Sequence, residues 1–338
     1  MLNSVKITAV EDSMASERLV IGIDLGGTKI STGLVSESAQ VIARDYRETL
    51  ATEGEDEVIG RMVDAAHTVM REASVTADQV AAVGVGSPGP LDIKAGIVMG
   101  APNLQGWECV PLKQRIEDAL GIPTFLENDA NAAALGEHRF GAGRGFDHMI
   151  YVTVSTGIGG GLILGGSLFY GVDGMAGEIG HTTILANGPR CGCGNRGCLE
   201  ALASGTAIAR SARESLVSGV PTIMTELAGG DPGRITARLV AEAAGQGDAE
   251  AHRILIEAMN YLGIGMANLV NLFNPQLIVI GGGVASIGDE LFESVRRAVM
   301  RHALPATKKS IQIVPAKLGS DVGMLGAAAV GLTRSEST

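Results

Sequence analysis

Apolar and β-branched residues gather in short runs along the first fifty positions, and glycine-rich or polar stretches separate these runs. Residues 19–24 form the first run, residues 30–35 alternate between apolar and small polar positions, and residues 41–48 form a third run. Short runs of this kind, bounded by turn residues, are typical of β-strands. Because residues 25–29 contain two consecutive glycines, the pattern predicts three strands with a tight turn after the first.

The next hundred residues carry helical as well as strand patterns. Apolar residues recur at helical spacing over 56–74, whereas 80–86 is a short apolar run that ends in the turn sequence SPGP. Residues 121–126 predict another strand, and the alanine-rich stretch 130–138 predicts a helix. Asn128 therefore lies where a strand gives way to a helix N-terminus.

The second half begins as the first does. Residues 149–154 predict a strand, residues 155–161 a glycine turn and residues 162–164 a return strand. Later elements are helices over 199–274, a strand over 276–280 that runs into three glycines, a strand over 311–314 and an apolar helix over 323–332. A strand–glycine-turn–strand unit thus opens each half, which predicts an α/β protein with two lobes and a cleft between them.

Length and composition agree with two lobes and exclude several classes of protein. The 338 residues exceed one typical core, and 46% hydrophobic against 19% charged residues exclude a largely disordered chain. A net charge of −11 with no basic run excludes a protein that works mainly by neutralising nucleic-acid phosphates. No stretch is apolar enough to span a bilayer, and residues 1–18 lack the pattern of a signal peptide. We expect a flexible N-terminal extension, no membrane partner and a cytoplasmic location.

The first glycine turn is a candidate phosphate-binding site. Glycine lets backbone N–H groups approach an anion closely, and here Gly26 and Gly27 stand beside the hydroxyl of Thr28 and the ammonium of Lys29. A carboxylate would repel phosphate, so Asp24 is expected to bind, through water, the Mg²⁺ that bridges nucleotide phosphates. The same glycines also suit an ordinary hairpin. The motif is neither the P-loop nor the dinucleotide fingerprint.

Two further glycine turns strengthen the nucleotide hypothesis. One contains Thr156 and Gly157, and the other contains Gly282 and Gly283 directly after the strand at 276–280. The last turn could hold adenosine or its ribose against the backbone. Each turn alone can be purely structural, but three turns that each follow a strand favour a bound nucleotide.

Asp129 is the candidate catalytic base. Phosphoryl transfer needs positioning, charge neutralisation and a group that accepts the proton of the attacking hydroxyl. Asp129 lies at the strand–helix junction, with Asn128 beside it to bond a polyol. The alternative is that Asp129 is only a helix N-cap, which is the commoner role of a lone aspartate.

A cysteine-rich loop predicts a structural metal site. His181 is followed by Cys191, Cys193 and Cys198, and one imidazole with three thiolates completes the tetrahedral set of Zn²⁺. Such a closed set would hold a loop and leave no position for a metal-bound water. The alternative is three buried free thiols. Cys109 stands alone and is expected to be a small core residue.

Four motifs together resemble the ROK family (repressor, open reading frame, kinase), and within it the glucose-phosphorylating kinases. They are DLGGTK at 24–29, ENDAN at 127–131, GEIGH at 177–181 and CGCGNRGCLE at 191–200. The resemblance covers about residues 19 to 332. It implies the actin-like ATPase, ribonuclease-H-like duplicated fold, with a small lobe over 19–132 plus 321–338 and a large lobe, with the zinc loop, over 133–320.

The resemblance also implies a hexose kinase with glucose as first substrate. Asp129 would be the base for the sugar 6-hydroxyl, and His181 would ligate zinc as well as contact the sugar. The implied sugar contacts are Gly89, Asn103, Asn128, Asp129, Glu178, His181 and Glu200. The implied contacts to ATP and Mg²⁺ are Asp24, Gly26, Gly27, Thr28, Lys29, Thr156, Gly157, Gly282 and Gly283. On their own, Glu178 and Glu200 would more often be surface charges.

The sequence is also compatible with two other functions. The chain could phosphorylate another hexose or an N-acetylhexosamine, because the sequence does not show the pocket around the sugar 2-position. It could also be a sugar-sensing regulator without catalysis, although the first strand begins too early for a preceding DNA-binding module. Family members are often dimers or tetramers, so we expect a homo-oligomer.

Overall fold

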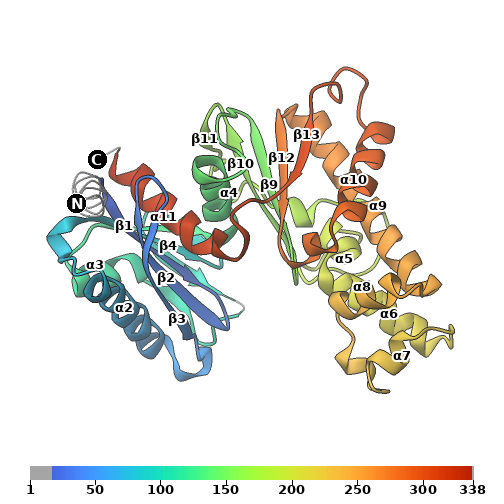
Figure 1. Ribbon diagram of the computed structural model, residues 1–338, viewed down its shortest axis with the longest axis horizontal. Helices are drawn as coiled ribbons and strands as arrows, with labels where there is room; N and C mark the ends of the chain where they lie inside the picture. Colours follow the sequence, from blue (N-terminus) through green and yellow to red (C-terminus); the bar gives the residue numbers. More distant parts are fainter. Residues whose placement is uncertain (1–16, 102, 337–338) are drawn as a thin grey trace, which may run out of the picture. The chain divides into compact units, whose positions relative to one another are not determined.

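The computed structural model describes residues 17–101 and 103–336, and these residues form two compact units (Figure 1). Unit 1 contains the described residues up to Arg144, residues 171–174 and the segment from Leu318 onward, and unit 2 contains residues 145–170 and 175–317. The sequence-based division began the large lobe at residue 133, whereas the contacts keep the whole helix α4 (Asp129–Phe140) in unit 1. Most of the expected N-terminal extension lies outside the described residues.

Unit 1 is built on a five-stranded sheet with helices on both faces. The strand order is β3-β2-β1-β4-β8, with β2 and β3 antiparallel to their neighbours and β1, β4 and β8 mutually parallel. The strands are β1 (Leu19–Leu25), β2 (Lys29–Ser36), β3 (Val41–Glu48), β4 (Val80–Ser87) and β8 (Thr124–Asn128). Helices α2 (Glu55–Glu72) and α3 (Leu112–Leu120) cover one face, and α4 and α11 (Val322–Ser335) cover the other.

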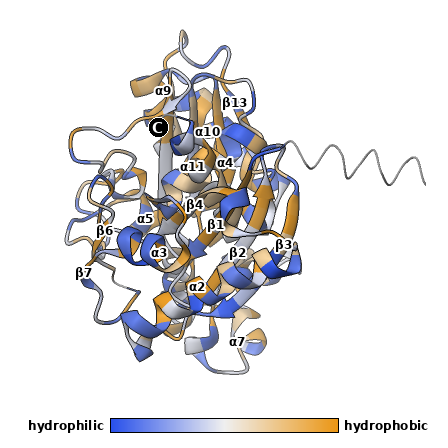
Figure 2. Cartoon of the chain, turned by 90° about the vertical axis from the view of Figure 1, so that its left-hand side faces the viewer, coloured by the Kyte–Doolittle hydropathy of each residue, from blue (hydrophilic) through white to orange (hydrophobic). Residues whose placement is uncertain are grey.

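Alternation along β1 explains why helices cover both faces. Ile21 and Ile23 belong to the apolar cluster under α2 and α3, whereas Val20 belongs to the cluster under α11. Glycine permits α11 to lie close: a Cβ at Gly84 would come 1.8 Å from the carbonyl oxygen of Ala327. In Figure 2, the central strands β1 and β4 are mainly hydrophobic, and α2 carries one hydrophobic and one hydrophilic face.

Unit 2 repeats the sheet of unit 1. Its order is β11-β10-β9-β12-β13, again with two antiparallel neighbours on one side and two parallel neighbours on the other. The strands are β9 (Met149–Val154), β10 (Ile158–Leu164), β11 (Ser167–Leu168), β12 (Leu277–Gly281) and β13 (Gln312–Pro315). The helices are α5 (Leu199–Ala203), α6 (Gly205–Val217), α7 (Met224–Leu227), α8 (Ala237–Gly245), α9 (Ala249–Phe273) and α10 (Asp289–His302). The duplication predicted from the strand–turn–strand repeat is confirmed.

The glycine-rich run at 155–161 differs from the prediction. The turn is short, and the glycines at 159–161 lie within β10, paired with β9. A Cβ at Gly160 would lie 2.3 Å from Cδ1 of Ile179 and 2.8 Å from the carbonyl oxygen of Tyr151. This glycine is therefore required by close packing in a strand, not by a phosphate turn.

A small three-stranded sheet in unit 1 was not predicted. It consists of β5 (Leu91–Asp92), β6 (Ile97–Gly100) and β7 (Glu108–Val110). Cys109 lies in β7 and is exposed, so the expectation of a small core residue is wrong. Within the described ranges, no helix combines the length and apolar character needed for a membrane crossing.

Candidate active site and metal centre

The junction between β8 and α4 presents Asp129 at the start of a helix. Asn128 is the N-cap: its side-chain oxygen accepts hydrogen bonds from the backbone N–H groups of Ala130 at 3.0 Å and Asn131 at 3.3 Å. Asp129 is the first helical residue, so the alternative in which Asp129 is only the N-cap is wrong. It is exposed, and its Oδ1 also accepts from Ala130 N, at 2.8 Å. A ligand that approaches this helix end can therefore reach the carboxylate.

Glu127, which the sequence analysis did not single out, supports this junction from inside. The side chain is fully buried, and its Oε1 accepts from Asn128 N at 3.0 Å and from Asn131 Nδ2 at 3.2 Å. The guanidinium of Arg334 lies 3.8 Å from the other oxygen. These contacts fix the backbone that carries Asp129. The signal in the sequence was a glutamate at the end of a buried strand, because a carboxylate is rarely buried unless it has hydrogen-bonding or charged partners.

Asp24 lies at the end of β1, close to Asp129. It is in register with Gly86 of β4, where a Cβ would lie 4.0 Å from Asp24 Oδ1 and 3.9 Å from Asp129 Cα. Burial, and then the negative charge of Asp129, raise the pKa of Asp24 to about 6, against the opposing effect of Lys29. The pair is a negatively charged cluster of the kind that a divalent cation neutralises.

The first glycine turn is a tight hairpin beside Asn103. A hydrogen bond of 2.9 Å from Gly26 N to Lys29 O closes the turn. A Cβ at Gly27 would lie only 2.8 Å from Cβ of Asn103, so the close approach requires glycine. Thr28 and Lys29 are exposed. The structure thus brings this turn together with one of the expected sugar contacts.

Gly89 lies against Asn128 in the same unit. A Cβ at Gly89 would come 3.6 Å from Asn128 Nδ2, and the peptide bond between Gly89 and Pro90 is cis. Asp24, Asn128 and Asp129 therefore lie at the carboxyl edge of the parallel strands of unit 1, with Gly89 just beyond the end of β4. This edge is where ligands bind in open α/β sheets.

The other two glycine turns lie side by side in unit 2, after the parallel strands β9 and β12. Gly282 has a φ of 86°, and a Cβ there would come 2.4 Å from the carbonyl oxygen of Val154. Both the backbone conformation and the space therefore require glycine. A Cβ at Gly283 would lie 4.0 Å from Oγ of Ser155. The helix α6 supports the neighbouring turn, because its Thr206 hydroxyl donates to the Thr156 carbonyl at 2.8 Å.

A pocket of about 990 Å³ in unit 2 is lined by both of these turns. Thr156, Thr206 and Gly283 contribute polar groups on one side. The apolar lining consists of Ala209, Ile235, Ala237, Ala241, Val284 and Ile287. Arg213, Arg238 and Glu242 add charged groups; they come from the region that the sequence described only as helical. Ser155, Gly205, Thr236 and Ser286 complete the lining. A pocket of this size with both apolar and polar walls suits an organic cofactor.

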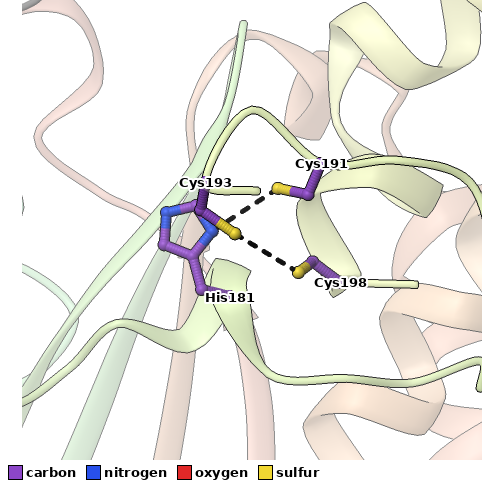
Figure 3. A group of neighbouring side chains, drawn as sticks. All are labelled: His181, Cys191, Cys193 and Cys198. Carbon is purple, nitrogen blue, oxygen red and sulfur yellow. Dashed lines mark hydrogen bonds between the residues drawn. The ribbon is translucent and has the colours of Figure 1, made fainter. Parts of the chain in front are cut away.

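The side chains of His181, Cys191, Cys193 and Cys198 meet in unit 2 (Figure 3). Their ligand atoms all lie within 4.8 Å of one another. Cys193 Sγ lies 3.7 Å from Cys198 Sγ, and Cys191 Sγ lies 3.6 Å from His181 Nδ1. Around a tetrahedral Zn²⁺ with Zn–S of about 2.3 Å and Zn–N of about 2.0 Å, ligand atoms would be about 3.5–3.8 Å apart. The four residues therefore fit a closed structural zinc site.

The chemistry of the thiols also favours a bound cation. Burial raises the pKa of Cys191 and raises the pKa of Cys198 to about 12. A hydrogen bond from the backbone of Asn195 lowers the pKa of Cys193. Without a cation, burial keeps Cys191 and Cys198 as neutral thiols, whereas a divalent cation displaces their protons and binds all three sulfur atoms as thiolates. A metal explains the cluster better than free thiols do.

Glu178 lies behind the histidine of this cluster. Its Oε2 is 3.9 Å from Nε2 of His181, whereas the other ring nitrogen faces the sulfur atoms. This distance is too long for a hydrogen bond, so Glu178 lies near the imidazole without occupying Nε2. Glu178 is exposed, so it is also accessible to a ligand.

Glu200 links the cysteine loop to the second glycine turn. Its Oε2 accepts from Ile158 N at 3.0 Å, and its Oε1 lies 3.7 Å from Cys191 Sγ. A Cβ at Gly157 would come 2.4 Å from Oε2. Gly157 therefore makes room for the carboxylate of Glu200; neither it nor Gly282 lines the pocket, and both shape the backbone around it.

Comparisons with known proteins agree with this architecture. Residues 20–334 match the ROK family. The glucokinase of Thermotoga maritima is 41% identical over 311 residues, which are 92% of this chain and 96% of the relative. A ROK family glucokinase from Streptomyces griseus, solved in complex with glucose and AMPPNP, has a TM-score of 0.79 and 36% identity, covering 93% of this chain and 99% of that one. The xylose repressor of Caldicellulosiruptor bescii is 33% identical over 311 residues, which are 92% of this chain but 77% of the repressor.

The duplicated sheets define a protein of the actin-like ATPase fold, as expected from the sequence. The chain belongs to the ROK family. The matched relatives include glucokinases and xylose repressors, so membership of the family does not by itself fix the activity.

Proposed function

We propose that this chain is a sugar kinase that transfers the γ-phosphoryl group of ATP to a hexose, with glucose as the preferred acceptor. The observation that carries the proposal is the exposed carboxylate of Asp129, which lies close to Asp24. Asp129 is the first residue of α4, and Asn128 caps the N-terminus of this helix. Regulators that only sense a sugar need a sugar pocket, but they do not need a base beside a second carboxylate. The names of the glucokinase relatives support the choice of glucose.

In unit 1, Asp129 accepts the proton of the sugar 6-hydroxyl as that oxygen attacks the γ-phosphorus in line with the leaving ADP oxygen. Asn128, Asn103 and the backbone at Gly89 orient the other hydroxyls. Asp24 is placed to hold Mg²⁺, which neutralises the negative charge of the phosphates when bound. Gly26, Gly27, Thr28 and Lys29 supply backbone and side-chain donors to the phosphate oxygens.

In unit 2, the pocket beside the second and third glycine turns receives the nucleoside. The hydroxyl of Thr156 and the backbone at Gly283 face the phosphate tail and ribose, and Gly157 and Gly282 give the two turns the backbone shape that this contact needs. The apolar lining from α6 and α8 suits a purine face. The described residues that line this pocket all belong to unit 2, so nucleotide binding should tolerate substitutions in unit 1 outside the phosphate turn at residues 24–29.

The zinc site has a structural role in this proposal. His181 binds the metal through Nδ1 and leaves Nε2 to a sugar hydroxyl, with Glu178 and Glu200 as further sugar acceptors. The metal-held loop therefore fixes three side chains that select the substrate. A thiolate site also needs a reducing compartment, which supports the cytoplasm as the location.

The decisive experiment is the substitution Asp129→Asn. Glucose-dependent ADP production, followed by a coupled assay, should fall by about 10²–10⁴-fold in kcat because the base is lost. Zinc content and nucleotide binding should stay normal. Asp78→Asn, at an exposed aspartate of unit 1, is the matched control. Near-normal turnover by the Asp129 variant would defeat the assignment.

The acceptor is tested by one series of assays. Glucose, mannose, N-acetylglucosamine, N-acetylmannosamine, fructose and allose are compared at equal concentration. The highest kcat/KM is expected for glucose. A preference for an N-acetylated sugar would keep the kinase and change its substrate.

A sugar-responsive regulator is the second candidate, because a repressor matches the chain over the same length. That function predicts sequence-specific DNA binding, which a gel shift with sugar-operon promoter DNA would detect. Wild-type kinase activity without a gel shift favours the enzyme. The expected dimer or tetramer is checked by light scattering.

A further inference from the structure

Glu137 is a buried carboxylate near the end of α4 that the proposed reaction does not use. The side chain is fully buried. Its Oε2 accepts a hydrogen bond from Ala142 N, and its Oε1 accepts one from Leu318 N, both at 2.8 Å. A carboxylate removed from water is costly unless such donors compensate for the lost hydration. The two backbone bonds therefore explain how Glu137 is tolerated in the interior.

The residues that Glu137 holds lie beside the two main points at which the chain passes from one unit to the other. The chain leaves unit 1 after Arg144 and returns to it at Leu318. The first crossing is held doubly, because the carbonyl oxygen of Glu137 also accepts from Gly141 N at 3.0 Å and Gly143 N at 2.8 Å. Two segments far apart in the sequence are thus fixed to one side chain.

The helix that carries Glu137 also carries the proposed base. Asp129 and Glu137 are eight residues apart on α4, a distance of about 12 Å along the axis. The helix cannot slide against α11: a Cβ at Gly136 would come 2.8 Å from Gly326 Cα, and a Cβ at Gly326 would come 2.4 Å from Ala132 O. Residues 130–137 are all buried. A change in the crossing segments is therefore transmitted to the N-terminus of α4 through a rigid element.

We propose that Glu137 is a positioning residue of the kinase, whose carboxylate fixes both crossing segments to the helix that carries Asp129. This inference rests on the proposed function. Loosening the segments reduces the fraction of molecules in which Asp129 and the bound nucleotide are in productive geometry. The loss should appear in kcat, while nucleotide affinity should not change, because Glu137 touches neither the pocket of unit 2 nor the phosphate turn at residues 24–29.

The test compares Glu137→Gln with Glu117→Gln. Glu137→Gln keeps the shape of the side chain, but its amide NH₂ replaces one of the two acceptor oxygens and so faces a backbone N–H that it cannot bond. The control removes the charge of another unit 1 glutamate that accepts a backbone N–H, from Thr124 at 3.3 Å, but holds no crossing segment. At saturating glucose and ATP, kcat of Glu137→Gln should fall about tenfold, as expected for one charge-assisted hydrogen bond lost from the productive state. The control should stay within about twofold.

Two further readouts separate positioning from general damage. The affinity for a non-hydrolysable ATP analogue should be unchanged in Glu137→Gln, and hydrogen exchange of peptides that contain Ala142 and Leu318 should accelerate together. Normal kcat in the folded variant, or an equal loss of nucleotide affinity, would overturn the proposal. Should Glu137→Gln fail to fold, Leu318→Pro removes one N–H donor at a φ of −79° that proline accepts, and its kcat should fall in the same way. A wild-type protein without kinase activity would instead reject the proposed function itself.

Discussion

Replacement of Asp24 by Asn should make the protein more stable and less active at the same time. The pKa of Asp24 is about 6 in the folded protein, whereas the ordinary value for an aspartate is 3.8. At about 1.4 kcal/mol per pH unit, this difference is worth about 3 kcal/mol for a fully shielded carboxylate, and about 1–2 kcal/mol for one that is partly exposed. The neutral amide of Asn avoids this cost, and it also loses the charge that holds Mg²⁺.

The sign of the pH dependence follows from where the proton is bound. Between about pH 4 and pH 6 the folded wild-type protein keeps the Asp24 proton and the unfolded chain does not, so wild-type stability falls as pH rises through this window. Asp24→Asn has no such loss. The variant should therefore match the wild type near pH 4 and exceed it by about 1–2 kcal/mol at pH 7.

Urea unfolding at several pH values measures this difference. The single tryptophan, Trp107, is buried in unit 1 and reports unfolding of that unit by fluorescence. Asp78→Asn serves again as the exposed control. A variant that is less stable than the wild type at pH 7, or equally stabilised at every pH, would refute the reasoning. Loss of Mg²⁺-dependent kinase activity in the same variant completes the test.

Two further predictions concern unit 2. Chelation of the metal, or Cys193→Ser, should release the cysteine loop and weaken glucose affinity by about tenfold while leaving nucleotide affinity within about twofold, as calorimetry can measure, with Cys109→Ser as the control. Gly282→Ala should lower nucleotide affinity more than glucose affinity, because a Cβ at this φ of 86° would meet the Val154 carbonyl. An equal loss of affinity for the two ligands, relative to the wild type, would contradict the assignment of this turn.

The strands, the duplication and the zinc ligands were predictable because their signals are local. Residues 19–24 and 149–154 are mainly apolar over the length of one strand, and a turn that contains glycine follows each of them. This pattern depends only on residues that are neighbours in the sequence. His181 and the three cysteines lie within eighteen positions, so donor type and spacing sufficed. The identity of Asp129 as a candidate base also came from its place between a strand and a helix.

Other features depend on contacts that no local pattern records. The sequence could not show that Asp24 and Asp129 are close enough to influence each other, because parallel pairing of β1, β4 and β8 brings them together. It assigned Gly160 to a turn, whereas packing against Ile179 places this glycine in a strand.

The sequence alone thus determined which chemical groups the protein contains and which short elements present them, because hydrophobic periodicity and ligand spacing are properties of neighbouring residues. The tertiary structure alone decided which groups meet. Glu137 illustrates the difference: its two backbone partners lie five and 181 positions away. Only the folded chain brings Ala142 and Leu318 to one carboxylate, since long-range contacts arise from the packing of whole helices and sheets.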